Sequence, residues 1–250
     1  MPFALLLLLA PAPRAQTPAT RAAAAAPTRL QQADALYSQR LDPRKLDESM
    51  GIWEALLRSE PSNFEAAWKL ALASYFKGAH ASEKSLRRAI FLKGVQAAQK
   101  AIAAAPDRAE GWYWRGVLNG SYAREKGVFK SLSMLKPIRE DFEKAARVDP
   151  SVNRGGPDRA LGRYYFEVPG FLGGSKEESL THLKRALAYD ETETLTHLFL
   201  GDTYASLGRF VDARREYQTV LDAPVQPDWA AEDKENKGKA DAALKKLEGK

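Results

Sequence analysis

Two arginines four residues apart are the side chains with the clearest capacity for chemistry in this sequence. Arg159 and Arg163 fall on one face of a predicted helix, where two guanidinium groups would suit a bound carboxylate. The alternative is a solvated face on which Arg163 pairs with Glu167, four residues further on. The sequence alone leaves both interpretations open.

Residues for catalysis or metal binding are sparse. The chain of 250 residues contains no cysteine and 3 histidines, which excludes thiol chemistry, disulfides and thiolate metal sites. His182 and His197 lack the spacing of metal ligands, and acidic pairs such as Glu140-Asp141 have no accompanying histidine. No Gly-x-Ser-x-Gly elbow argues for serine hydrolysis. We therefore expect a protein that is not an enzyme and that uses no metal or cofactor.

The charge balance argues against nucleic acid as a partner. The chain has 38 Lys and Arg against 32 Asp and Glu, a net charge of +6, without a dense basic stripe. The basic run Lys84, Arg87, Arg88 and Lys93 could touch anionic lipid or nucleic acid, although such a run is more commonly a solvated helix face. We expect only weak attraction to anions and no nucleic-acid partner.

Two runs of three aromatic residues add candidate ligand contacts. Trp112-Tyr113-Trp114 and Tyr164-Tyr165-Phe166 each spread their rings over about 200° of a helix, at about 100° per residue. The six rings therefore cannot all enter one seam between helices. The surplus rings either pack against neighbouring helices or line an aromatic groove.

A helical repeat is predicted to position these side chains. From Leu30 onward apolar residues recur with helical period, and Pro or Gly breaks recur roughly every forty residues. Gly201 in the clearest copy lets a partner helix approach closely. That copy reads His197-x-x-Leu200-Gly201-x-x-Tyr204, then Gly208, Ala213-x-x-x-Tyr217-x-x-Val220 and Pro224. It resembles the tetratricopeptide repeat, Trp-x-x-Leu-Gly-x-x-Tyr followed by Ala-x-x-x-Phe and a terminal Pro.

Four looser copies precede this one in the same register. Their closing prolines Pro61, Pro106 and Pro150 stand about 45 residues apart, against 34 for a standard unit. We expect the extra length within 82–104 and around 123–135. The prediction is an all-α, right-handed superhelix of about five tetratricopeptide-like hairpins over residues 30–224. It has long inserts in repeats two and three, and residues 225–250 form a C-terminal capping helix.

A narrower resemblance is carried by residues 155–186. They combine a Gly155-Gly156 entry, Leu161-Gly162-x-x-Tyr165, and the loop Val168-Pro169-Gly170-x-x-Gly173-Gly174. This stretch resembles the T component of tetratricopeptide-associated TRAP transporters and the regulator-of-microtubule-dynamics group. The transporter resemblance implies an extracytoplasmic helical protein that associates with a solute-binding subunit and has a cleft for an apolar ligand. This chain departs from that family because it lacks the lipid-attachment cysteine.

The loop at 168–174 also has a local explanation. Pro169 is expected to end the preceding helix, and Gly170, Gly173 and Gly174 to permit tight or left-handed turns. Phe171 and Leu172 are expected to tuck back between helices.

Partner contacts in tetratricopeptide proteins usually come from the first helix of each repeat. We expect a protein or peptide segment on the concave face, in an extracytoplasmic scaffold or adaptor. The alternative is an accessory protein of a TRAP-type transporter that binds a small apolar acid or lipid in a helical cavity. An open groove lined by Arg159, Arg163 and Asp202 would indicate a peptide, and an enclosed cavity lined by Trp68, Tyr113 and Phe166 an apolar ligand. The candidate contact residues are Trp68, Tyr75, Tyr113, Arg159, Arg163, Phe166 and Asp202.

The start of the chain predicts export. Phe3–Ala10 is apolar but far shorter than the roughly 20 residues that span a bilayer, so residues 1–16 are interpreted as a signal peptide. The alternative is a disordered hydrophobic start in a cytoplasmic protein, because no Lys or Arg precedes the apolar run. Residues 17–29 are Ala- and Pro-rich and are expected to be a linker. We expect a periplasmic or secreted protein with no transmembrane segment in the mature chain.

Overall fold

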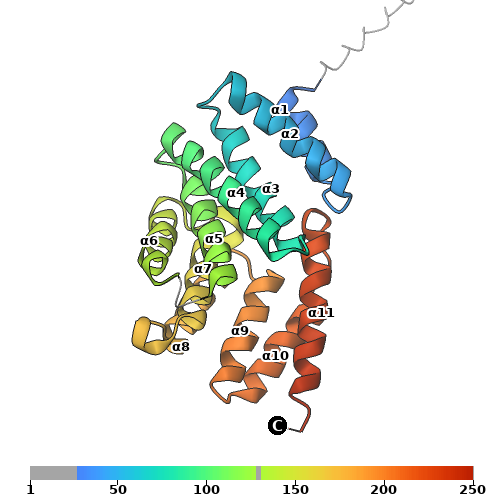
Figure 1. The fold of residues 1–250 in the computed structure, drawn as a ribbon. Helices are drawn as coiled ribbons and strands as arrows, with labels where there is room; N and C mark the ends of the chain where they lie inside the picture. Colours follow the sequence, from blue (N-terminus) through green and yellow to red (C-terminus); the bar gives the residue numbers. More distant parts are fainter. Residues whose placement is uncertain (1–26, 128–130, 250) are drawn as a thin grey trace, which may run out of the picture.

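The computed structural model describes residues 27–127 and 131–249. Within them lie eleven α-helices, ten of which pair as antiparallel hairpins stacked side by side (Figure 1). This confirms the predicted all-α fold of helical hairpins. The hairpins are α1 (Arg29–Tyr37) with α2 (Pro43–Ser59), α3 (Phe64–His80) with α4 (Lys84–Ala104), α5 (Ala109–Lys126) with α6 (Leu132–Val148), α7 (Val152–Glu167) with α8 (Lys176–Leu187), and α9 (Thr194–Ser206) with α10 (Phe210–Asp222). Helix α11 (Ala230–Lys246) follows them.

Short polar side chains begin several of these helices. Thr28 and Gln31 form a capping box at the start of α1, and Thr28 belongs to the stretch 17–29 that was expected to be linker. Asn63 accepts a hydrogen bond from the Ala66 amide at the start of α3, and Ser175 does the same for Glu178 at the start of α8. The predicted signal peptide 1–16 and the greater part of the predicted linker 17–29 lie outside the described residues.

Glycines bring the two helices of a hairpin close together. A Cβ at Gly201 would collide with the Tyr217 ring on the partner helix, which is the close approach expected from the sequence. Equivalent collisions would occur between Gly116 and Phe142, and between Gly162 and Leu183.

The helices of the second and third hairpins are longer than those of the last hairpin. Helices α3 and α4 have 17 and 21 residues, and α5 and α6 have 18 and 17. Helices α9 and α10 of the last hairpin have 13 each. At a rise of about 1.5 Å per residue, the longer helices extend several ångströms beyond those of the last repeat.

The apolar core falls into two clusters that α11 connects. One runs from Ala33 to Leu161 and the other from Leu180 to Leu247. Ala231 near the start of α11 packs against the first cluster, and Ala240 belongs to the second. Figure 1 shows α11 running past α9 and α10, with its N-terminal end beside the N-terminal hairpins. Helix α11 therefore spans between the two ends of the repeat array. Among the described residues, none of the helices combines the length and apolar character needed to cross a membrane.

A buried histidine joins α9 to α10. His197 is 9% exposed, its Nδ1 lies 2.8 Å from Glu216 Oε2, and its Nε2 lies 2.9 Å from the Glu191 carbonyl oxygen. Because both ring nitrogens face acceptors, only the imidazolium donates to both. Burial of the ring lowers its pKa. The bonds to Glu216 and Glu191 and the negative charges of Glu216 and Glu193 outweigh burial, so the pKa of His197 is raised.

We expect the stabilisation from this imidazolium to decrease with rising pH. A raised folded-state pKa makes the contribution fully present below the unfolded pKa of about 6.5. It is lost as pH rises through the raised folded pKa. Urea unfolding from pH 5.5 to 8.5 should show the stability difference between the wild type and His197→Gln shrinking towards high pH. A difference that is constant with pH would contradict the charged assignment.

Candidate ligand-binding site

A large cavity lies on the face formed by the first helices of the hairpins. It has a volume of about 660 Å³, and we call it the inner cavity. Its walls come chiefly from α3, α5, α7 and α9, and residues of α1, α4, α6 and α11 complete them. This is the face on which partner contacts were expected from the repeat pattern.

Aromatic side chains dominate the middle of the inner cavity. The Tyr75 and Trp114 ring centroids are 5.8 Å apart, and those of Tyr113 and Trp114 are 4.9 Å apart. Burial raises the pKa of the Tyr75 and Tyr164 hydroxyls. Within residues 27–127 and 131–249, neither of these hydroxyls has a hydrogen-bond partner, and nor does that of Tyr37. The three tyrosines are only partly buried and line the cavity, so their hydroxyls are available to a ligand there.

The Arg159 guanidinium forms hydrogen bonds to the protein's own backbone. It is 5% exposed, its Nη1 and Nη2 donate to the carbonyl oxygens of Arg154 and Asn153 at 2.9 Å each, and Nη1 lies 3.3 Å from Glu193 Oε2. Asn153, Arg154 and Gly155 have φ of 51°, 60° and 75°, so Arg159 fastens one left-handed turn at the start of α7. Its position at the cavity wall is therefore structural.

Arg163 is shared by two carboxylates. Its Nε donates to Glu167 Oε1 at 2.7 Å and its Nη1 to Asp202 Oδ2 at 2.9 Å. Its guanidinium also lies over the Phe166 and Phe199 rings, at 4.9 and 4.6 Å from their centroids. The pairing with Glu167 is the second of the two alternatives drawn from the sequence. The proposed clamp of two free guanidinium groups around a carboxylate is not formed.

Other cations of the inner cavity also have acidic partners. Arg87 binds Glu125 through two nitrogens at 2.9 and 3.0 Å, and Arg124 Nε lies 3.3 Å from Glu167 Oε2. Lys239 Nζ lies 2.7 Å from Glu235 Oε1. Because the positive groups of the wall are paired, the cavity is better suited to an uncharged ligand than to an anion.

The structure gathers part of the predicted site. Tyr75, Tyr113, Arg159 and Arg163 line the inner cavity. The other three candidates lie outside its lining. Trp68 donates from Nε1 to Glu65, Phe166 lies beneath Arg163 and Lys176, and Asp202 accepts from Arg163 and the Tyr217 hydroxyl.

Each aromatic run divides between the cavity and packing. Tyr113 and Trp114 face the cavity, whereas Trp112 donates to the Pro106 carbonyl oxygen. Tyr164 faces the cavity, whereas Tyr165 stacks on His182 with centroids 5.4 Å apart. Within each run, some rings therefore line the cavity and others pack against the protein, so each of the two alternatives is correct for part of the run.

The loop after α7 differs from expectation at two residues. Phe171 is 79% exposed, so the prediction that it tucks back between helices is wrong. Gly173 is left-handed with φ of 96°, and a Cβ at Gly174 would collide with the Val168 carbonyl oxygen, so both positions need glycine. Gly170 has open space around it and no positive φ. Pro169 follows the end of α7, as expected. The loop is held by its own turns and does not line the cavity beyond Val168.

Helix α11 and the turn before it supply residues that the sequence analysis missed. Trp229, Glu232 and Asn236 line the inner cavity, although this stretch was interpreted only as a polar cap. Trp229 at the start of a charged helix was the available signal, since a large ring there needs a surface to cover. In the part of the chain described, no group of three or more acidic or histidine side chains is placed to hold a metal ion.

Comparison with known families gives one match. The model described as "Regulator of microtubule dynamics protein 1-3" matches residues 29–171, which includes all of the first three hairpins and α7. A search of curated proteins finds none that matches the chain.

Solved structures with similar folds include a tetratricopeptide-repeat protein and a pilus biogenesis factor. A thermophilic tetratricopeptide-repeat protein of Thermus thermophilus superposes with a TM-score of 0.64 at 19% identity, covering 86% of this chain and 97% of that one. PilW, described as a widely conserved type IV pilus biogenesis factor, gives 0.57 at 18%, covering 89% and 93%. PilF of Pseudomonas aeruginosa gives 0.52 at 15%, covering 89% and 95%. At these identities the likeness shows the fold, which is that of a tetratricopeptide-like helical repeat.

Proposed function

The chain belongs to the regulator of microtubule dynamics protein 1-3 family, and from this membership, its repeat fold and its inner cavity we propose that it is a non-catalytic scaffold or adaptor. Its inner face holds a segment of a partner protein. The supporting observation is a cavity of about 660 Å³ between first helices, with the Tyr75 and Tyr164 hydroxyls open to an occupant.

The packing of the chain's own C-terminal helix is an argument that this face binds a polypeptide. Helix α11 lies against the cavity, and Arg40 holds its Glu232 carboxylate with Nη2–Oε2 at 2.6 Å. Buried Asp233 of α11 accepts from the Thr194 hydroxyl at 2.8 Å. The inner face thus already accommodates one helix through a mixture of apolar and polar contacts, which is how helical grooves bind peptides.

A second candidate is a cavity for a small apolar molecule or lipid. The contribution of α11 to the wall and the presence of Tyr75 and Tyr113 in the lining favour it. Because Arg159 and Arg163 are already paired with carboxylates, an uncharged ligand fits the wall better than the apolar acid expected from the sequence. Association with a TRAP-type transporter stays a prediction from the sequence resemblance.

The proposal includes the finer architecture and location. In it the hairpins form a right-handed superhelix, the lengthened second and third repeats wall the cavity, and α11 caps the array. The protein acts outside the cytoplasm, a location that depends on the apolar segment 3–10 as part of a signal peptide. Cell fractionation with a C-terminal epitope tag would test the location, and retention in the cytoplasm would contradict it.

A cavity-filling variant tests the inner face. Gly120 lines the cavity in mid-helix, and a Cβ there would meet only Ile138 Cγ2 at 4.0 Å. Gly120→Leu should therefore fold and block the site. Gly238→Leu in α11 is the matched control, because it also replaces a helical glycine with open space around it.

Native mass spectrometry of the protein purified from its own source gives the readout. A polypeptide bound to the wild type and Gly238→Leu but absent from Gly120→Leu is the expected result. A small molecule released from the wild type and Gly238→Leu but not from Gly120→Leu would favour the second candidate. Bare protein in all three samples would contradict both.

A further inference from the structure

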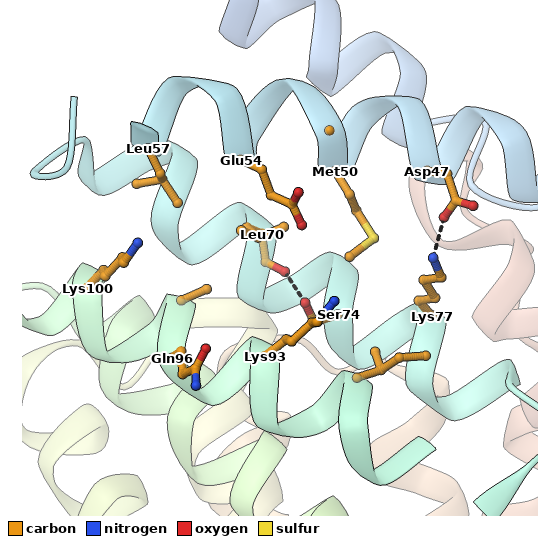
Figure 2. A pocket seen from close by; sticks show the side chains of 13 residues that line it. Asp47, Met50, Glu54, Leu57, Leu70, Ser74, Lys77, Lys93, Gln96 and Lys100 are labelled. Carbon is orange, nitrogen blue, oxygen red and sulfur yellow. Dashed lines mark hydrogen bonds and ion pairs between the residues drawn. The ribbon is translucent and has the colours of Figure 1, made fainter. Parts of the chain in front are cut away.

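A second groove lies on the opposite face of α3 from the inner cavity. It runs between α2 and α4 with α3 as its floor, and its volume is about 450 Å³ (Figure 2). We call it the outer groove. The first helices of the other hairpins contribute nothing to it, so it is separate from the site of the proposed function.

The outer groove has an apolar floor and room above it. Leu70 of α3 and Ile90 of α4 lie at the floor with Met50 of α2 beside them. On α2, a Cβ at Gly51 would meet nothing within 4 Å. The backbone of α2 therefore leaves space for a side chain that comes from outside the chain.

The rims of the groove carry charges without partners. Lys77 is neutralised by Asp47, with Nζ–Oδ1 at 2.5 Å. Among the described residues, neither Lys93 nor Lys100 has a carboxylate within ion-pair distance, and Glu54 on the facing helix has no cation. Figure 2 shows the two lysines along α4 and Glu54 across the groove on α2. The two lysines are seven positions apart, which corresponds to about 10.5 Å along α4.

We propose that the outer groove docks a helix of a partner protein that carries two carboxylates seven residues apart with an apolar side chain between them. The carboxylates meet Lys93 and Lys100, and the apolar side chain enters over Gly51. A helix lying along α4 repeats at the same rise, so acidic residues at i and i+7 match the lysine spacing. A trough between two helices over a third also has the geometry of helix packing.

The groove can be filled without disturbing the fold. Gly51→Leu replaces a helix-interior glycine that has free space around it, so helix propensity rises and the groove closes. Gly238→Leu makes the same change in α11, away from the groove, and serves as the control. Lys93→Glu combined with Lys100→Glu reverses the charge of the rim.

The probe is a synthetic, helix-stapled, fluorescein-labelled peptide with Glu at i and i+7 and Leu at i+3 and i+4, and its counterpart has Lys in place of Glu. Fluorescence anisotropy with the full chain should show the Glu peptide binding the wild type and Gly238→Leu equally. Binding to Gly51→Leu and to the double charge reversal should be weaker by about tenfold or more. The Lys peptide should prefer the charge-reversed protein.

Three results would overturn the proposal. They are equal binding of the Glu and Lys peptides to the wild type, unchanged binding by Gly51→Leu, and binding of phosphatidylglycerol vesicles in place of the peptide with the same dependence on Lys93 and Lys100. Gly120→Leu should leave peptide binding unchanged, so failure at the outer groove is distinguishable from failure at the inner cavity.

Discussion

Replacing Arg159 by alanine should lower the free energy of unfolding by about 3–5 kcal/mol. The guanidinium is buried, and it donates to two carbonyl oxygens of a left-handed turn. Alanine leaves those carbonyls without their donor. It also leaves Glu193, which is 7% exposed, with the more distant Arg154 at 3.8 Å as its one remaining cation among the described residues, although Glu193 still accepts from the Thr196 amide and hydroxyl.

The left-handed turn explains why lysine should not rescue this position. Asn153 and Arg154 adopt positive φ without being glycine, which costs about 1–2 kcal/mol for each residue unless other contacts hold them. Arg159 holds them with two nitrogens in one plane, and an ammonium cannot reproduce that fork.

Urea denaturation at pH 7 measures the effect, with Arg163→Ala as the control. Arg163 carries the same charge one turn away but is 27% exposed, so its removal should cost about 1 kcal/mol or less. Arg159→Lys should resemble Arg159→Ala. If Arg159→Ala lost no more stability than Arg163→Ala, the structural role assigned to Arg159 would be wrong.

The repeat pattern predicted the fold because its spacing reflects packing. Gly201 and Tyr217 occupy the positions at which two helices of a hairpin must approach closely, and the structure places the Tyr217 ring against Gly201. Such constraints are local to one hairpin, so they are visible in a sequence of some thirty residues. The same logic placed Tyr75 and Tyr113 on first helices, and both line the inner cavity.

The repeat pattern could not predict contacts between residues that lie far apart in the sequence. Arg159 and Arg163 are one turn apart, yet one is buried by a backbone turn at 153–155 and the other reaches Asp202 in the next hairpin. Helical spacing alone cannot distinguish these environments. Phe171 is exposed because turns within its loop, not packing between helices, fix the backbone. The wall formed by α11 depends on Arg40 and Glu232, which are 192 residues apart.

The pair Arg40 and Glu232 supports a second prediction. Arg40→Ala should release the start of α11 and lower the free energy of unfolding by about 2–4 kcal/mol. Arg40 is 8% exposed, its Nε and Nη2 donate to the two Glu232 oxygens at 3.2 and 2.6 Å, and Nη2 also donates to the Asp228 carbonyl oxygen at 3.0 Å. The guanidinium lies over the Tyr37 and Phe76 rings, at 5.1 and 5.3 Å from their centroids. Alanine removes this contact between the first hairpin and α11.

The loss should be local to the beginning of α11, because the rest of that helix has separate anchors. Lys237 Nζ donates to the Leu221 and Ala223 carbonyl oxygens at the end of α10, and Asn236 donates to the Thr194 hydroxyl. Hydrogen exchange should therefore quicken by about tenfold or more at amides 233–235, the first in α11 that can bond within the helix, with little change in α9 and α10. Arg44→Ala is the control, since Arg44 lies near the same turn with its side chain 91% exposed, and it should change neither stability nor exchange.

Because Trp229 and Glu232 form a wall of the inner cavity, faster opening at this end should also quicken the exchange of any occupant. Uniformly faster exchange along α9, α10 and α11 would instead mean that Arg40 stabilises the whole array, and that α11 does not open by itself.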